Sequence, residues 1–131
     1  MDGPAQMLAA DAASTALGIR PLALADGTAT LSMTVTERMI NGHGIAHGGY
    51  VFLLADTAFA CACNRPGSVT VAAQAEIDFL VPCGVGDELV ATAVERVRTG
   101  RSGIYDITVR RGDQVVAEFR GRSRTLRHPP A

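Results

Sequence analysis

Apolar and polar positions follow two different patterns along the chain. From Gly48 to Cys63 nearly every side chain is apolar or small, which predicts one helix buried on all sides. In residues 27–36 and 68–82 apolar residues recur at every second position, a period typical of strands. Three further strands are predicted at residues 86–100, 102–111 and 114–126.

Turn-forming residues set the ends of these elements. Pro66 bars the long helix from continuing beyond about Asn64, and residues 111–113 (Arg-Gly-Asp) predict a tight hairpin between the last two strands. Residues 4–17 carry apolar side chains at near-helical spacing, so they predict a short amphipathic helix that Gly18 closes.

The order of elements is helix, strand, helix and then four strands joined by short turns. Strands with hairpin-length connections pair antiparallel, so the fold class is α+β, with a five-stranded antiparallel sheet that wraps the apolar helix. By this interpretation residues 1–131 form one domain with a frayed tail at 128–131. In the strand at 68–82 the apolar odd-numbered positions are expected to share one face. They are Val69, Val71, Ala73, Ala75, Ile77, Phe79 and Val81.

Composition excludes several classes of function. A net charge of -1 gives no basic field for nucleic acid, and the longest apolar run is too short to span a membrane. All twelve basic residues are arginine, so no lysine is present to form a Schiff base. The three cysteines lack metal-type spacing and the first residues do not resemble a signal peptide, so we expect reduced thiols and a cytoplasmic location.

One charged residue, Asp56, lies in the middle of the apolar helix. A buried carboxylate without a partner costs several kcal/mol or shifts its pKa upward, so the residue needs a partner or a chemical role. One interpretation is a structural Asp that is hydrogen-bonded to a Ser or Thr of a strand. The other is a functional carboxylate, which the residues before the helix favour.

His47, Gly48 and Gly49 stand where the helix begins. The first amide groups of a helix lack intrahelical acceptors, and glycine lets a ligand oxygen approach the backbone closely. Such a helix start can hold the oxyanion that develops during acyl transfer. A glycine pair before a helix is, by itself, more often explained by packing.

The spacing of the two features adds a geometric condition. Gly48 and Asp56 are eight positions apart, which is roughly 12 Å along a helix. One carbonyl carbon cannot lie about 3 Å from both groups. Two antiparallel copies of the helix across a twofold axis would bring Asp56 of one chain to Gly48 of the other, so catalysis predicts an obligatory homodimer.

The same residues carry a family resemblance. The segments NGHGIAHGGYVFLLADTAFACACN, AEIDFLVPCGVGDELVATAV, GIYDITV and AEFRGRSRT resemble the hotdog-fold acyl-CoA thioesterases, most closely the PaaI-type (phenylacetyl-CoA thioesterase) branch. The resemblance implies active sites at a dimer interface, often with dimers paired into a tetramer, and no cofactor beyond the coenzyme A of the substrate. It also implies that Asp56 is the base or nucleophile and Gly48 the oxyanion amide, while His47 and Asn41 orient substrate or water.

Other positions are weaker candidates for contacts with the substrate. Some relatives carry a Ser or Thr on the strand after the helix, where this chain has Ala72 and Ala73. Gly49 adjoins the proposed oxyanion site. Arg98 and Arg101 flank a turn, and they are either solvated surface charges or contacts for the phosphates of coenzyme A.

Alternatives remain for several of these residues. His43 and His47 are four apart but lack a carboxylate at a motif spacing, which disfavours a metal site, and Asn41 with Gly42 can simply form a turn. A hotdog-fold hydratase or dehydratase would need His47 as its base. A non-catalytic acyl-CoA-binding module would keep the pocket without turnover.

Overall fold

The computed structural model describes residues 3–127. The tail predicted to fray, 128–131, lies outside the described residues. The elements in chain order are α1 (Pro4–Ala9), α2 (Ala12–Ala16), β1 (Arg20–Ala25), β2 (Thr28–Thr34), a 3-10 turn η1 (Glu37–Met39), α3 (Gly48–Cys63), β3 (Thr70–Phe79), β4 (Glu88–Thr99), β5 (Ser102–Arg111) and β6 (Gln114–Thr125).

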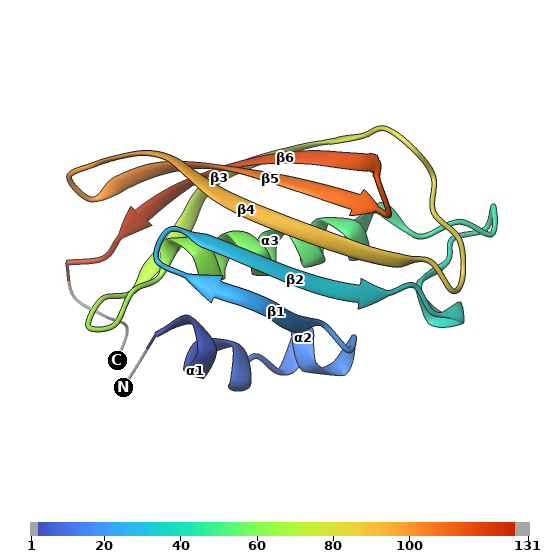
Figure 1. The fold of residues 1–131 in the computed structure, drawn as a ribbon, viewed down its shortest axis with the longest axis horizontal. Helices are drawn as coiled ribbons and strands as arrows, with labels where there is room; N and C mark the ends of the chain where they lie inside the picture. The colour runs from blue at the N-terminus through green and yellow to red at the C-terminus, as the bar shows by residue number, and fades with distance from the viewer. Residues whose placement is uncertain (1–2, 128–131) are drawn as a thin grey trace.

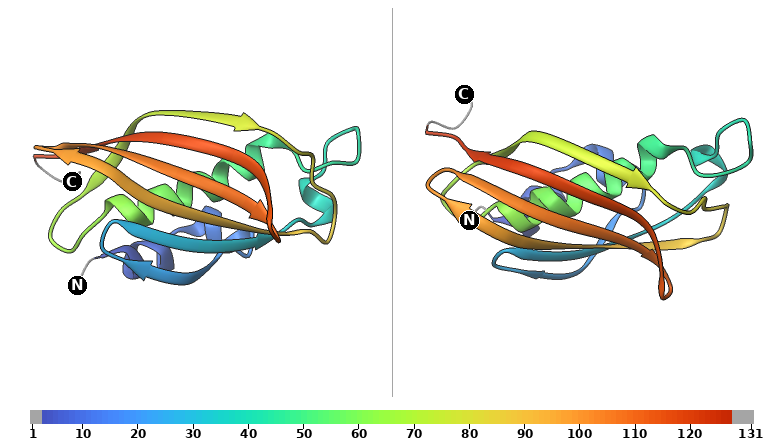
Figure 2. Two further views of the ribbon diagram at one scale, coloured as in Figure 1. Left: turned by 45° about the horizontal axis from the view of Figure 1, so that its top comes forward. Right: turned by 90° about the horizontal axis from the view of Figure 1, so that it is seen from above.

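A single antiparallel sheet curls around α3, as predicted (Figure 1). Its strand order is β1-β2-β4-β5-β6-β3, so β1 and β3 form the two edges. The two short helices α1 and α2 pack against α3 on the side of the β1 edge (Figures 1 and 2). This arrangement confirms the α+β class, with one correction in the number of strands, which is six rather than five.

The strand that sequence analysis missed is β1. Pro21 stands near its start, and all but one of its residues are exposed, so no alternation of buried and polar positions marks it. Proline is tolerated at a sheet edge because its missing amide donor faces no partner strand. The predicted helix at 4–17 is likewise wrong in detail, since α1 ends at Ala9 and Asp11 caps the separate helix α2, accepting from Ser14 N at 3.0 Å.

The predicted single apolar face of β3 is also wrong. The pairing of β3 with β6 shifts by one residue between Ala72 and Gln74, so Ala73 is the extra residue of a β-bulge. Directly paired residues share a face, and Ala75 pairs with the buried Gly121 whereas Val71 pairs with the exposed Arg124. The bulge therefore exchanges the two faces of the strand halfway along.

The packing of α3 on the sheet depends on a missing side chain. A Cβ at Gly121 would lie 2.7 Å from the ring of Phe59, which is 1% exposed. Gly121 thus provides the space in which the helix approaches β6. The same ring lies 5.5 Å from Tyr105 and 5.9 Å from Phe119, measured between centroids, so aromatic packing fixes α3 against β5 and β6.

Polar contacts anchor the C-terminal end of α3. Asn64 Nδ2 donates to the backbone oxygens of Ala60 and Thr70, and Asn64 Oδ1 accepts from Thr70 N at 2.9 Å. One side chain therefore caps the helix and holds the first residue of β3. Arg65 pairs with Glu95 of β4 at 2.9 Å, and the buried Tyr105 hydroxyl donates to the same carboxylate at 2.8 Å.

Across residues 3–127, no helix combines the length and apolar character that crossing a bilayer requires.

Candidate functional site

The start of α3 leaves one backbone amide available. His47 is the N-cap residue, and its ring Nδ1 accepts from Gly49 N at 3.1 Å, while Tyr50 N donates to His47 O at 3.0 Å. Within the described chain no protein acceptor receives Gly48 N–H. The position predicted for the oxyanion donor is thus a free amide at the positive end of a helix of 16 residues.

The His47 ring has one nitrogen left for a ligand. Because Nδ1 accepts the capping hydrogen bond, the proton of a neutral ring lies on Nε2, which is a donor. The side chain is exposed, so that donor faces outward. To act as a base, this ring would have to accept a proton at Nδ1, which breaks the capping hydrogen bond, or first release the proton from Nε2. This weighs against His47 as the base of a dehydratase.

A structured loop positions the helix start. Asn41 Oδ1 accepts from His43 N at 2.9 Å and from Ile45 N at 3.4 Å, so the side chain does form the turn proposed as its simpler role. The amide group of Asn41 keeps its Nδ2 donor for other partners. Two backbone hydrogen bonds of 2.7 Å, from Ala46 to Cys83 and from His47 to Met39, fix the loop to its neighbours.

A hollow of about 390 Å³ opens beside these groups. Its polar contributions include Asn41 and the Gly48 backbone, and its other walls are mostly apolar. The lining residues are Asn41, Ile45, Ala46, Gly48, Val51, Phe79, Leu80, Val81, Pro82, Cys83 and Val116. A small polar end with apolar walls suits the acyl part of a thioester.

Asp56 lies apart from this hollow, about two turns further along α3. Its carboxylate is half-buried and, among the described residues, neither accepts a hydrogen bond nor pairs with a cation. Burial raises its pKa above the ordinary value, and the negative charge of Asp11 raises it further. Asp11 is held nearby because it bonds Ser14, whose hydroxyl lies 2.8 Å from that of Thr57. Within one chain no described strand Ser or Thr donates to Asp56, so the structural interpretation finds no such partner there.

The helix is not covered on all sides, contrary to the prediction. Gly49, Leu53, Asp56 and Ala60 are not fully buried, and they recur every three to four positions. This stripe, the open stripe of α3, faces away from the packed core. It carries both the helix start and the carboxylate.

The edge strand β3 adds apolar surface that the chain itself does not cover. Its ladder pairs with β6 on one side, and the other side is an edge of the sheet. Val71, Phe79 and Leu80 are 40%, 55% and 56% exposed. An unpaired edge with exposed apolar side chains is typical of a surface that another chain covers.

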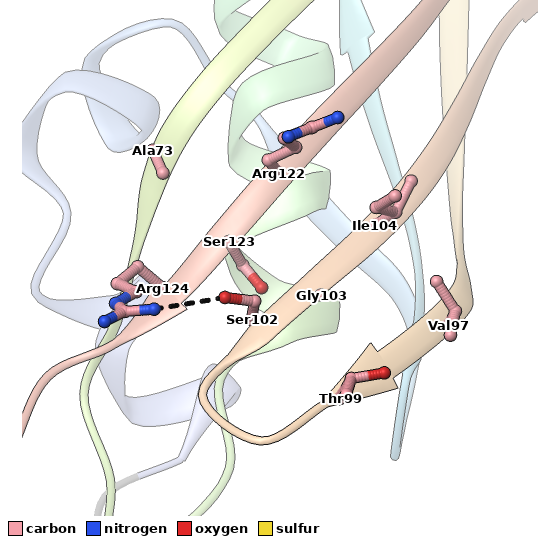
Figure 3. A pocket seen from close by; sticks show the side chains of 9 residues that line it. All are labelled: Ala73, Val97, Thr99, Ser102, Gly103, Ile104, Arg122, Ser123 and Arg124. Carbon is pink, nitrogen blue, oxygen red and sulfur yellow. Dashed lines mark hydrogen bonds between the residues drawn. The ribbon is translucent and has the colours of Figure 1, made fainter.

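The alanines of β3 diverge at the bulge. Ala72 pairs with the buried Ser123 and so lies on the helix side, whereas Ala73 lines a second hollow, of about 360 Å³, on the outer face (Figure 3). Arg122 and Arg124 line the same outer hollow, and Arg124 donates to Ser102 Oγ at 3.2 Å (Figure 3).

The two predicted arginines, Arg98 and Arg101, lie at the hairpin that joins β4 and β5. Arg98 pairs in register with Gly103, whose missing side chain would point at Ser123 and Tyr105 on the helix side. Arg98 therefore faces away from the outer hollow, and Arg101 lies in the turn between β4 and β5. A contact of either residue with substrate stays a prediction.

Over residues 3–127 no group of three His, Cys, Asp or Glu side chains is arranged to hold a metal ion.

Comparison with known proteins identifies the family. The model of the Thioesterase superfamily matches residues 43–118, more than half of the chain. The chain belongs to the thioesterase superfamily. It is 48% identical over 117 residues to the acyl-coenzyme A thioesterase PaaI of Escherichia coli K12, an alignment that spans 88% of this chain and 84% of the relative.

Solved structures place this superfamily member in the hotdog fold. The E. coli PaaI protein from the phenylacetic acid degradation operon superimposes with a TM-score of 0.90 at 46% identity, covering 93% of this chain and 89% of that one. A mutant of the phenylacetic acid degradation protein PaaI from Thermus thermophilus gives a TM-score of 0.86 at 37% identity, covering 88% and 100%. The hotdog fold and the PaaI-type resemblance are thereby confirmed.

Sequence analysis overlooked Phe79 as a candidate site residue. It was assigned to an apolar strand face, but the structure places its ring against Gly48, 31 positions earlier in the chain. A contact of that range leaves no local pattern. The one available signal is a large aromatic residue close to the end of a strand, just before Pro82.

Proposed function

We propose that this chain hydrolyses acyl-CoA thioesters, with phenylacetyl-CoA and related aryl-acyl-CoA molecules as substrates, to a free acid and coenzyme A. The observation that carries the proposal is the free amide of Gly48, a residue that lines a mostly apolar hollow together with Asn41. The family and the thioesterase activity named for the E. coli relative support it.

In the proposed reaction, the thioester carbonyl oxygen accepts the Gly48 N–H bond. That contact strengthens as negative charge develops on the oxygen in the tetrahedral intermediate. Asp56 either takes a proton from the attacking water or attacks the carbonyl carbon itself. The carbon–sulfur bond then breaks and the coenzyme A thiolate leaves. On the general-base route the proton held by Asp56 passes to that thiolate; on the nucleophilic route water then cleaves the acyl-Asp56 anhydride to the free acid and the Asp56 carboxylate. Asn41 Nδ2 and His47 Nε2 are donors that would orient water or substrate. The reaction needs no metal or organic cofactor.

The proposal requires two copies of the chain, because Asp56 and Gly48 are roughly 12 Å apart on one helix. The open stripe of α3 and the unpaired edge of β3 are adjacent surfaces that a second copy would cover. An antiparallel arrangement across a twofold axis brings Asp56 of each chain to the helix start of the other, forming two composite sites. Pairing of two such dimers into a tetramer stays a prediction.

The test separates the amide from the side chain. Proline at the first position of a helix is tolerated, and His47 before it already has extended angles of φ -62 and ψ 134, which suit a residue preceding proline. Gly48→Pro therefore removes the N–H and keeps the backbone path, and its Cβ, which would lie 3.0 Å from Phe79 Cζ, displaces the exposed tip of that ring. Gly48→Ala is the matched control, since it adds a Cβ and keeps the N–H. We expect the proline variant to lose at least about 100-fold in kcat relative to the alanine variant.

Mixed dimers test whether the site is shared. Chains carrying Asp56→Ala and chains carrying Gly48→Pro are each inactive alone by this proposal. Refolded together in equal amounts they give hybrids in which one site keeps both intact groups, so about a quarter of wild-type activity returns by random assortment. An inactive preparation in which hybrids are demonstrated by mass spectrometry would disprove the composite site.

A further inference from the structure

Phe79 ends the edge strand β3 and has an unusual environment for a phenylalanine. It pairs with the small Ala117, and its side chain is 55% exposed. A Cβ placed at Gly48 would lie 3.0 Å from Phe79 Cζ and 3.3 Å from Cε1, so the tip of the ring abuts the first residue of α3. Gly48 has no positive φ, so the ring, not the backbone conformation, is what restricts the side chain at this position.

The ring forms one wall of the hollow beside the free amide. Among the described residues that line this hollow, Phe79 supplies the one aromatic side chain, and the others are aliphatic, sulfur-containing or glycine, apart from the amide of Asn41. Leu80 follows it on the same wall and is equally exposed, at 56%. Phe79 and Leu80 are thus neighbouring apolar side chains of similar exposure, and Phe79 alone of the two carries an aromatic ring with which an aromatic ligand can interact.

The free amide and the Phe79 ring meet at the same residue, Gly48, and both border the same hollow. A carbonyl oxygen that accepts from Gly48 N–H lies about 3 Å from that nitrogen. For a phenyl group one methylene away from that carbonyl, Phe79 is the one aromatic side chain that the hollow offers among the described residues. Aromatic rings prefer edge-to-face or offset arrangements with centroids about 4.5–7 Å apart, and such pairs add attraction beyond the burial of apolar area.

We infer that Phe79 is a specificity-determining residue that favours acyl groups with an aromatic ring over aliphatic ones of similar size. The inference rests on the proposed function and extends it to one side chain. The ring holds no proton and takes no part in bond breaking. Its effect is on how well the bound acyl group is oriented against the Gly48 amide, and therefore on the ratio of kcat/KM values for the two kinds of substrate.

The experiment compares phenylacetyl-CoA with hexanoyl-CoA, measured as release of coenzyme A thiol. Phe79→Leu keeps an apolar side chain and removes the ring, and Phe79→Ile is a second variant of the same kind. We expect the ratio of kcat/KM values, phenylacetyl over hexanoyl, to fall by about 2- to 10-fold in both. Leu80→Ala is the matched control, which changes the same wall without touching an aromatic ring and should lower both values in parallel.

The outcomes separate the inference from the proposed function. A wild-type protein that releases no thiol from either substrate would disprove the proposed function. A wild-type protein that hydrolyses both, with an unchanged ratio in Phe79→Leu and Phe79→Ile, would overturn the role of Phe79 alone. A parallel loss on both substrates would assign Phe79 to packing or assembly, which circular dichroism and sedimentation of the variants would show directly, and would equally overturn it.

Discussion

Replacing Asp56 by asparagine should inactivate the enzyme and stabilise its fold at the same time. Asparagine has nearly the shape of aspartate but can neither take a proton from water nor attack a carbonyl. A general base contributes about 10²- to 10⁴-fold to the rate, so we expect kcat to fall by at least about 100-fold. KM should change little, because the carboxylate acts on the carbonyl carbon or on water and does not hold the substrate.

The gain in stability follows from the environment of the carboxylate. Asp56 is half-buried, accepts no hydrogen bond from the described residues, and lies near the negative charge of Asp11. Both effects raise its pKa from the ordinary value of 3.8, so the ionised form is less favourable in the folded chain than in the unfolded one. A full pK unit would correspond to about 1.4 kcal/mol of unfolding free energy, and the cost at this half-buried carboxylate is smaller because solvent screens its charge.

The sign of the pH dependence distinguishes this explanation from others. Below the unfolded pKa the carboxyl is protonated in both states, so Asp56 costs nothing there. The cost develops as the pH rises from the unfolded pKa to the raised folded pKa, and it is complete above the folded value. The advantage of Asp56→Asn should therefore be present at pH 7 and largely absent near pH 3, which lies below the ordinary value of 3.8. Urea unfolding of both proteins at the two pH values measures it.

Asp113→Asn is the matched control, because it removes the same charge from the exposed turn between β5 and β6. It should change the unfolding free energy little at either pH. An Asp56→Asn variant that is less stable than wild type at pH 7 would refute the reasoning, since it would mean that a favourable contact, such as the helix start of the second chain, outweighs the burial of the carboxylate. An equal difference at both pH values would exclude ionisation as the cause.

Two further predictions concern packing and the nucleotide part of the substrate. Gly121→Ala should lower the unfolding free energy by about 1–3 kcal/mol, because the added Cβ would lie 2.7 Å from the enclosed ring of Phe59. Gly84→Ala, in open space, is its control, and equal urea midpoints for the two would contradict the packing argument. Arg101→Gln should raise KM for acyl-CoA by about 2- to 5-fold, as for an exposed ion pair, and leave KM unchanged for a thioester truncated before the phosphates. A similar rise for both substrates would remove Arg101 from the binding site.

Sequence reasoning predicted most clearly the elements with strong local signals. The bounds of α3 and β5 match the predicted ranges because proline, glycine and hairpin residues interrupt the pattern at their ends. The order of the strands after α3 followed from short connections. The roles of Gly48 and Asp56 as candidates followed from one charge in an apolar helix and from glycines before it.

The features that were missed depend on contacts distant in sequence. β1 carries no alternation because an edge strand with little packing needs none. The bulge at Ala73 is defined by pairing with β6, about fifty positions later, and it reverses the faces that a simple period of two predicts. The open stripe of α3 was predicted to be buried because it consists largely of apolar or small residues. Such residues can be buried within one chain or between two chains, and the sequence does not distinguish the two cases.

The free edge of β3 has a consequence for how the protein behaves when scarce. A folded monomer exposes a row of unpaired backbone donors and acceptors beside Phe79 and Leu80. Any extended peptide can pair with this row. If a second copy is what shields this row, resistance to heat must increase with protein concentration by mass action. Dilution would then threaten the fold itself, and the cell would have to keep the protein abundant to keep it intact.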